Sequence, residues 1–406
     1  MPEQRISQFE FIFVMAMLVS TVALAVDAML PAMAQIANDL SPTDPNRAQL
    51  IVTSFIFGMG LGTFFAGPLS DAFGRKPLVI LGGAIYVLGA FLTWSADTLD
   101  MAIAARVLQG FGAAAPRIVS VAIIRDLFSG REMARLMSFV MIIFTLIPAF
   151  APTFGALLIA WGGWRAVFLM FIGFCVFSTG WMVLRLSEPL PADRRRKLSA
   201  RALVHGTRDV FSHASVRTAI AALTLVFAML FSVLSVTQQI FDSYFDRADS
   251  FHLWFGFIAL VAGTSGFLNS ALVVRLGMRY LVTLALVVQS ALSLAMALLF
   301  QMPLSIELQF GLFIAWHIAI FFQTGMCIGN LNAMAMEPLG HIAGLGASVI
   351  GAVATVASVL FAVPVGLAFD GSPMPLIYGI LTYAVLALLF MIHLRRIEAR
   401  PTAQPG

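Results

Sequence analysis

Long apolar runs, each long enough to cross a lipid bilayer, follow one another along almost the whole chain. A helical crossing needs about 20 apolar residues, and these runs lack the alternation that marks the strands of a membrane β-barrel. We therefore predict an all-α membrane protein with twelve transmembrane helices. Their expected bounds are residues 9–36, 48–70, 78–96, 98–125, 136–160, 163–186, 217–241, 250–274, 280–301, 306–335, 341–369 and 373–394.

The composition excludes a soluble globule. Of the 406 residues, 60% are hydrophobic and 11% are charged, whereas a soluble domain is about half apolar and about a quarter charged. Cys175 and Cys327 lie inside apolar runs, which leaves no disulfide framework. The net charge of +4 does not indicate nucleic-acid binding, because Lys and Arg gather in short loops beside the runs, as on the cytoplasmic side of membrane proteins.

One polar stretch divides the runs into six and six. It contains two prolines and the basic run Arg194–Lys197, which predicts either a solvated linker or a contact with anionic lipid. Placing most Lys and Arg on one side puts both termini in the cytoplasm. The expected parts are an N-terminal six-helix bundle at 1–186, a basic cytoplasmic linker at 187–215, a C-terminal six-helix bundle at 216–394 and a cytoplasmic tail at 395–406.

A short charged loop recurs in both halves. Gly74-Arg75-Lys76 aligns with Gly277-Met278-Arg279 at an offset of 203 residues, which brings the second loop of each half into register. The second copy has Val274 where the first has Asp71. The repeat predicts two bundles related by pseudo-two-fold symmetry.

Three ionisable residues lie well inside the predicted spans of the first half: Asp27, Arg106 and Arg117. Such groups are costly in a membrane unless they are paired or hydrated, so each is a functional candidate. The two arginines are eleven residues apart and therefore share one helix face. Asp27 and Arg106 are expected at similar depth. Asp27 is thus either a proton carrier tuned by Arg106 or half of a structural ion pair.

Several polar residues are candidates for lining a substrate cavity. Arg117, Gln238, Gln239 and His317 lie within or at the ends of spans. Each also has a structural interpretation. Arg117 would be a side chain reaching toward the cytoplasm, Gln238 and Gln239 would form interhelical hydrogen bonds, and His317 would make a satisfied polar contact. No paired carboxylates, HExxH or metal-spaced histidines occur, so no enzyme activity, metal or cofactor is expected.

Together these residues resemble the major facilitator superfamily, and within it the twelve-helix drug:proton antiporters of the Bcr/CflA type. Gly67, Asp71, Gly74, Arg75 and Lys76 match the loop signature G-x-x-x-D-R/K-x-G-R/K-R/K. The chain departs from that signature at Ala72, where a cation is usual. The resemblance implies that this loop is the cytoplasmic gate of the first half.

Three further stretches carry the resemblance. Arg106–Gly110 (RVLQG) is similar to the R-x-x-Q-G signature, whose arginine the family associates with proton coupling. Asp27–Pro31 (DAMLP) resembles the D-M-Y-L-P stretch of the first helix, and 332–344 resembles the junction of helices 10 and 11. Ala151–Gly155 (APTFG) is a reduced form of the antiporter signature G-P-x-x-x-G-G, without its opening glycines. With Pro148, the residues Pro152 and Gly155 are the expected hinge.

The resemblance implies a secondary active transporter of the bacterial inner membrane. It would export small apolar or amphipathic molecules in exchange for protons by alternating access, as a monomer in the lipid bilayer, with Asp27 and Arg106 coupling the proton. An alternative is a facilitator or proton symporter for one neutral or anionic metabolite, which two arginines against one aspartate favour. A receptor or polytopic enzyme is disfavoured, because neither a soluble domain nor a catalytic set is present.

Overall fold

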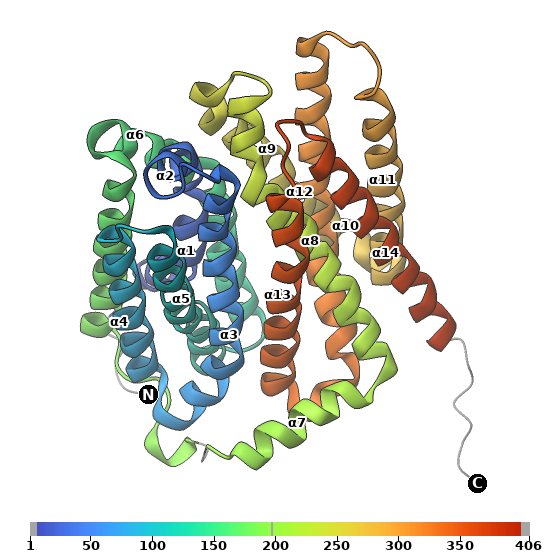
Figure 1. Ribbon diagram of the computed structural model, residues 1–406. Coiled ribbons are helices and arrows are strands. Elements are labelled where there is room, and N and C mark those ends of the chain that lie inside the picture. Colours follow the sequence, from blue (N-terminus) through green and yellow to red (C-terminus); the bar gives the residue numbers. More distant parts are fainter. Residues whose placement is uncertain (1–5, 196–197, 399–406) are drawn as a thin grey trace. The chain divides into compact units, whose positions relative to one another are not determined.

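The chain folds into helices joined by short turns (Figure 1). The computed structural model describes residues 6–195 and 198–398, and within these ranges there is no β-strand. The prediction of an all-α protein is therefore confirmed. Arg196 and Lys197 of the basic run, and residues 399–406 of the expected tail, lie outside the described residues.

Contacts between Cα atoms divide the chain into two compact units. The first unit comprises Met1–Ser199 and Leu234–Leu260, and the second comprises Ala200–Val233 and Val261–Gly406. The elements before Ser199 are α1 (Gln8–Asp27), η1 (Leu30–Ala32), α2 (Met33–Leu40), η2 (Pro45–Gln49), α3 (Leu50–Phe73), α4 (Arg75–Trp94), α5 (Leu99–Leu127), α6 (Gly130–Arg185) and η3 (Ala192–Arg194). Those that follow are α7 (Ala200–Ser212), α8 (Ala214–Ser243), η4 (Ala248–Ser250), α9 (Phe251–Gly263), α10 (Ser265–Leu276), α11 (Met278–Leu299), α12 (Ile306–Met336), η5 (Glu337–Ile342), α13 (Ala343–Leu367) and α14 (Met374–Glu398).

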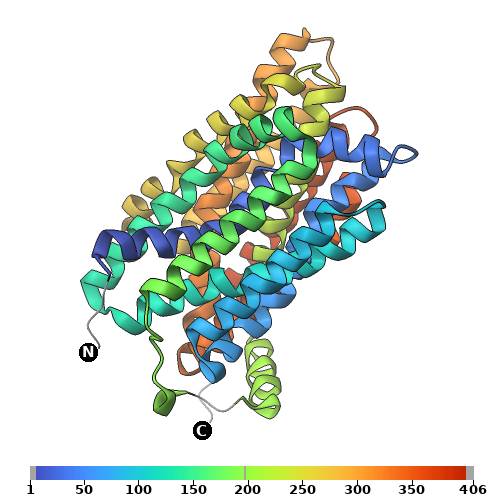
Figure 2. The same ribbon diagram turned by 90° about the vertical axis from the view of Figure 1, so that its left-hand side faces the viewer.

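In the first unit, α5 packs against both α3 and α4, and α1 packs against α6. Small residues bring α3 and α5 close together: a Cβ on Gly58 would overlap the carbonyl of Val107, and one on Gly62 the carbonyl of Phe111. Figure 2 shows α3 and α4 (blue) rising from the turn that joins them. This close helix contact places Arg106 of α5 beside α3.

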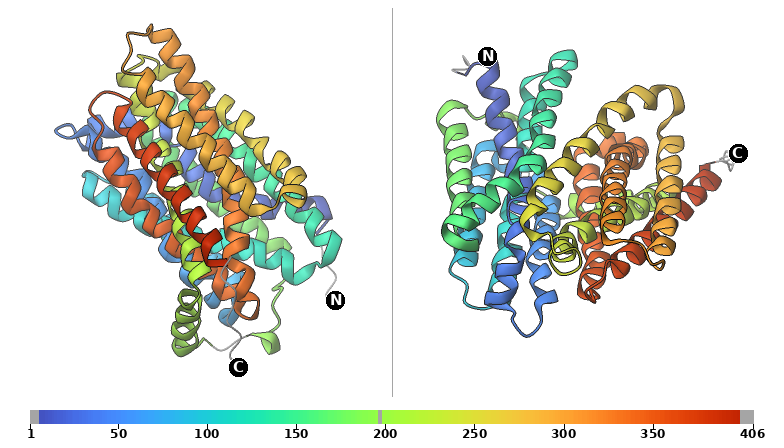
Figure 3. Two further views of the ribbon diagram at one scale, coloured as in Figure 1. Left: turned by 90° about the vertical axis from the view of Figure 1, so that its right-hand side faces the viewer. Right: turned by 90° about the horizontal axis from the view of Figure 1, so that it is seen from above.

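In the second unit, α11 packs against α12 and α14 (Figure 3, left), and α7 packs against α13. The α7–α13 contact is close, since a Cβ on Gly206 would overlap the side chain of Leu345. Asp209 of α7 also accepts a hydrogen bond from His341 at 2.7 Å between Oδ2 and Nε2. That bond lowers the pKa of the Asp209 carboxyl. The linker helix is thus fixed to the turn that precedes α13.

The two glycines paired by the sequence repeat have the same backbone conformation. Gly74 joins α3 to α4 with φ 104° and ψ 163°, and Gly277 joins α10 to α11 with φ 82° and ψ 151°. This region of φ/ψ space is accessible essentially only to glycine. The match supports the repeat at the level of backbone geometry: each half turns between two helices on a single glycine.

Gly277→Ala is expected to destabilise the protein by about 1–3 kcal/mol, the cost of holding a residue with a Cβ in this conformation. No atom lies within 4 Å of the position of the added Cβ, so the effect isolates backbone strain. Gly180→Ala is the matched control, because Gly180 lies in helical backbone with the same open space and alanine there stabilises by up to about 1 kcal/mol. Unfolding in detergent measures both; an equal response of the two variants contradicts the assignment.

Ten helical segments of the described chain are long and apolar enough to cross a membrane. Two of them are unusually long: Gly130–Arg185 has 56 residues and Ile306–Leu367 has 62. The first is interrupted by non-helical backbone at Gly162 and Gly163, and the second by η5. The span expected at 250–274 lies within a single candidate crossing, Ala248–Leu276, in which α9 is followed by α10 after Thr264.

Candidate functional site

Asp27 lies at the point where the first crossing breaks. It is the last residue of α1, and Pro31, whose ring nitrogen carries no hydrogen, stands in the short η1 before the chain resumes as α2. The Asp27 side chain is 5% exposed and has neither a hydrogen bond nor an ion pair with any described residue. A buried carboxyl without a fixed partner is therefore present where the helix is interrupted.

Arg106 of α5 lies beside the same end of α1. Its guanidinium is fully buried and donates to the carbonyl oxygen of Ala25 at 3.1 Å, to that of Ile51 at 3.1 Å and to Gln109 Oε1 at 2.7 Å. Its Cζ also lies 4.4 Å from the ring centre of Phe55. All these partners are neutral, so the ion pair with Asp27 that the sequence allows is not formed in this structure.

The arrangement caps the broken helix with a cation. The last carbonyls of a helix lack intrahelical donors and carry partial negative charge, which a cation stabilises. Arg106 bonds the Ala25 carbonyl, two residues before Asp27. On the other side, α6 packs on the break itself, because a Cβ on Gly155 would overlap the carbonyl of Ala28. Chemically, the site combines one titratable carboxyl with one guanidinium that does not neutralise it.

Arg117 shares the face of α5 that carries Arg106, as the sequence predicts. Its Nη1 lies 3.7 Å from Met59 Sδ on α3, and sulfur is a weak acceptor. Among the described residues, this is the only hydrogen-bond partner of its guanidinium. Both arginines therefore lie against α3, and Arg117 retains donors for other ligands.

The other cavity candidates are placed differently. Gln239 accepts from Gln49 at 2.6 Å and donates to Asn46 at 2.8 Å, which is the interhelical bonding that the sequence allowed as an alternative. Gln238 is 5% exposed in the same helix, α8. His317 of α12 is fully buried in the second unit, with Nδ1 3.0 Å from the carbonyl oxygen of Phe313. Their roles in a cavity stay predictions.

The charged loop at Gly67–Lys76 centres on Arg75, which is 4% exposed. Its guanidinium forms ion pairs with Asp71 at 2.6 Å and with Asp126, in the last turn of α5, at 2.7 Å. It also donates to Ser70, whose hydroxyl bonds the carbonyl of Gly67. These contacts tie the ends of α3, α4 and α5 together.

Glu188 completes this network from the start of the linker. Its carboxylate accepts the backbone N–H groups of Arg75 and Lys76, both at 2.9 Å, at the N-terminus of α4. An anion in this position accepts hydrogen bonds from amides that have no acceptor within the helix, and it also interacts favourably with the positive end of the helix dipole. Lys76 makes a second contact with the end of α6, because its Nζ donates a hydrogen bond to the carbonyl of Val183. Sequence reasoning missed Glu188 and Asp126; the only signal was that a helix beginning at Arg75 needs an acceptor.

The predicted hinge residues lie within helical backbone in this structure. Pro148 and Pro152 are inside α6, and the non-helical pair is Gly162 and Gly163, farther along. A bend at the prolines therefore stays a prediction. The described residues also contain no cluster of three or more His, Cys, Asp or Glu that could hold a metal ion.

The protein is a multi-pass helical membrane protein, and its first unit buries a carboxyl and a guanidinium where a helix is interrupted. These are features of a transporter. A family model described as Major Facilitator Superfamily matches residues 12–362. The chain belongs to this superfamily, and the prediction that it is a transporter rather than an enzyme is confirmed.

Individual relatives agree with this assignment. The bicyclomycin resistance protein homolog of Haemophilus influenzae is 28% identical over 356 residues, which cover 86% of this chain and 87% of the relative. A chloramphenicol resistance protein of Pseudomonas aeruginosa is 36% identical over 150 residues, 36% of this chain and 35% of the relative. The resemblance to the Bcr/CflA branch is confirmed at this level. The crystal structure of a D-xylose-proton symporter matches with a TM-score of 0.73 at 14% sequence identity, over 94% of this chain and 97% of that one. At this identity the match shows only that the two chains share a fold.

Proposed function

We propose that this protein exports small apolar or amphipathic molecules from the cytoplasm in exchange for protons. The observation that carries the proposal is Asp27, a buried carboxyl without a fixed partner beside the guanidinium of Arg106. A carboxyl that no ion pair holds in its charged form can take and release a proton as its surroundings change. The names of the bicyclomycin, chloramphenicol and multidrug resistance relatives support a drug as the exchanged molecule.

The architecture proposed for this activity has twelve crossings. Dividing Gly130–Arg185 at its glycine break and Ile306–Leu367 at η5 adds two crossings to the ten candidate helices. Residues 1–186 and 216–394 would then form two six-helix bundles that work by alternating access. We place the monomer in the bacterial inner membrane, with the 187–215 linker, the 395–406 tail and both termini in the cytoplasm.

In the proposed cycle, Asp27 carries the proton and Arg106 sets when it is released. Drug entering a cavity near α5 perturbs the guanidinium and its three neutral acceptors, which changes the field at the adjacent end of α1. Arg117 supplies donors to polar groups of the substrate, and Gln238, Gln239 and His317 are further cavity contacts. The Gly67–Lys76 network closes the cytoplasmic side, and Pro148, Pro152 and Gly155 form the hinge.

A second candidate is uptake of one neutral or anionic metabolite with a proton. The incomplete hydrogen bonding of Arg117 favours it, because an unpaired guanidinium attracts an anionic ligand. Overexpression in a drug-sensitive bacterium separates the two. We expect tolerance to several chemically unrelated apolar antibiotics, with none in cells producing Asp27→Asn. If overexpression of the wild type leaves antibiotic tolerance at the level of the host and speeds growth on a single nutrient, export is contradicted.

A further inference from the structure

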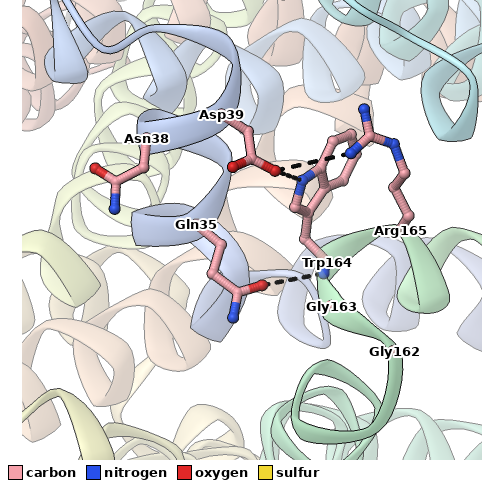
Figure 4. A pocket seen from close by; sticks show the side chains of 7 residues that line it. All are labelled: Gln35, Asn38, Asp39, Gly162, Gly163, Trp164 and Arg165. Atoms are coloured by element: carbon pink, nitrogen blue, oxygen red, sulfur yellow. Dashed lines mark hydrogen bonds and ion pairs between the residues drawn. The ribbon is translucent and has the colours of Figure 1, made fainter.

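A small polar cleft lies where the end of α2 meets the break in α6. Its volume is about 230 Å³. Figure 4 shows Gln35 and Asp39 of α2 pointing toward Trp164, while Asn38 points away from it. The cleft lies within the first unit, and no contact described so far explains why α2 presents three polar side chains here.

The break in α6 leaves backbone N–H groups that need hydrogen-bond acceptors, and α2 supplies one of them. Gly163 has φ 69° and ψ −177°, so the helix restarts after it with free backbone N–H groups. The Oε1 atom of Gln35 accepts the N–H of Trp164 at 3.1 Å. Asp39 accepts the indole Nε1–H of Trp164 at 2.8 Å and lies 3.7 Å from Nη1 of Arg165. Gln35 and Asp39 thus tie the second half of the first crossing to the restart of α6.

Two aromatic contacts lead from this tie to Arg106. Trp164 is 2% exposed and meets the ring of Phe168 edge to face, with centroids 5.8 Å apart. The ring of Phe168 in turn lies 5.7 Å from Cζ of Arg106. Because buried rings transmit displacement through close packing, a shift of Trp164 changes the surface on which the guanidinium rests.

The contacts of Gln35 and Asp39 with Trp164 also restrain Asp27 through the backbone. Only residues 28–32 separate Asp27 from α2, and α1 is anchored at its other end: Glu10 bonds Arg185 at 2.7 Å and Trp181 at 2.9 Å, both on α6. Both ends of the broken crossing are therefore held on the same helix, α6. The interrupted segment between them can change only as far as these anchors permit.

We propose that Gln35 and Asp39 are positioning residues for the proton site, which they hold in place by fixing the end of α2 to Trp164. This rests on the proposed function, since it assigns Asp27 and Arg106 to the reaction. The two residues do not touch the proton or the drug. They limit the movement of the segment that carries Asp27 and of the ring beneath Arg106.

Dicyclohexylcarbodiimide, an apolar reagent that modifies protonated buried carboxyls, tests the proposal without any drug. Its rate of reaction at Asp27 is measured by peptide mass spectrometry on the full-length protein in lipid nanodiscs. Gln35→Met keeps the length of the side chain but removes the amide oxygen. We expect the rate to rise about fivefold, the factor for losing one hydrogen bond that holds the segment. Asp39→Ala is an independent second variant with the same expectation.

Two matched variants separate positioning from general stability. Gln35→Glu keeps an acceptor for the Trp164 amide and should restore the wild-type labelling rate. Asn38→Ala changes a cleft residue without a hydrogen bond to Trp164 and should label as the wild type does. The proposal is overturned if Gln35→Met and Asp39→Ala, folded by their melting curves, label at the wild-type rate, or if Asn38→Ala raises the rate equally.

Transport supplies a second arm. In proteoliposomes, Gln35→Met should lower the maximal rate of drug-driven proton exchange while the drug concentration at half-maximal rate stays unchanged. If Asp27 labels as expected in all variants but the wild type exchanges no drug for protons, the proposed function fails and the tie at Trp164 stands. If exchange is normal in a Gln35→Met protein whose Asp27 is over-labelled, the positioning role is wrong and the proposed function stands.

Discussion

Asp27→Asn is expected to abolish proton-driven drug accumulation in everted membrane vesicles, with a fall of about a hundredfold or more, the contribution of a positioned proton-transfer group. Asparagine has nearly the same volume and cannot titrate. Because the Asp27 carboxyl has no ion-pair or hydrogen-bond partner among the described residues, its replacement leaves no unpaired cation behind. The variant should therefore fold and bind drug while failing to couple binding to protons.

The control for this variant is the same chemical change at the surface. Asp100 is 80% exposed in its side chain and pairs with Arg47, and such surface pairs contribute little. Asp100→Asn should accumulate drug as the wild type does. Full proton-driven accumulation by Asp27→Asn, measured at equal protein abundance, removes Asp27 from the mechanism.

Arg106→Lys should abolish transport and destabilise the protein by about 2 kcal/mol or more. A planar guanidinium reaches Ala25, Ile51 and Gln109 at once, whereas the compact ammonium of lysine cannot span these three acceptors. Each buried acceptor or charge left without its partner costs about 1–3 kcal/mol. Transport in vesicles and thermal unfolding in detergent measure the two effects.

Arg117→Lys is the comparison, because it lies on the same face of α5 and its only hydrogen-bond partner among the described residues is the sulfur of Met59. Its loss of stability should stay below about 1 kcal/mol, in keeping with a weak acceptor. If the two substitutions destabilise the protein equally, the three-acceptor arrangement is not what holds Arg106. If Arg106→Lys transports normally, the assignment of Arg106 to proton coupling is wrong.

Hydrophobic patterning located the helices well, because a membrane allows few alternatives to a continuous apolar helix. The repeat at Gly74 and Gly277 was also visible, since only glycine adopts the backbone conformation that both joints share. Patterning did not locate the end of α1 at Asp27, because apolar residues continue on both sides of it. The span expected at 250–274 agrees with the single crossing Ala248–Leu276, although α9 and α10 are separate elements within it.

The candidate site was predictable only in part. Similar depth in the membrane correctly suggested that Arg106 lies near the end of α1 that carries Asp27, and it left open an ion pair that is not formed in this structure. The pair is not formed because two backbone carbonyls and Gln109 accept the guanidinium's hydrogen bonds instead, and backbone carbonyls carry no sequence signal. Asp126 and Glu188 were missed for a related cause: their distance from Arg75 in the folded chain depends on how α5 and the linker pack.

The central claim, exchange of a drug for a proton, is tested most directly in sealed proteoliposomes that contain a pH-sensitive dye. The protein is purified, the pH is equal on both sides at the start, and a gradient of a transported antibiotic is imposed. We predict proton movement opposite to the drug, present in the wild type and absent in Asp27→Asn. Proton movement in the same direction as the drug, or the same signal from Asp27→Asn, contradicts the account.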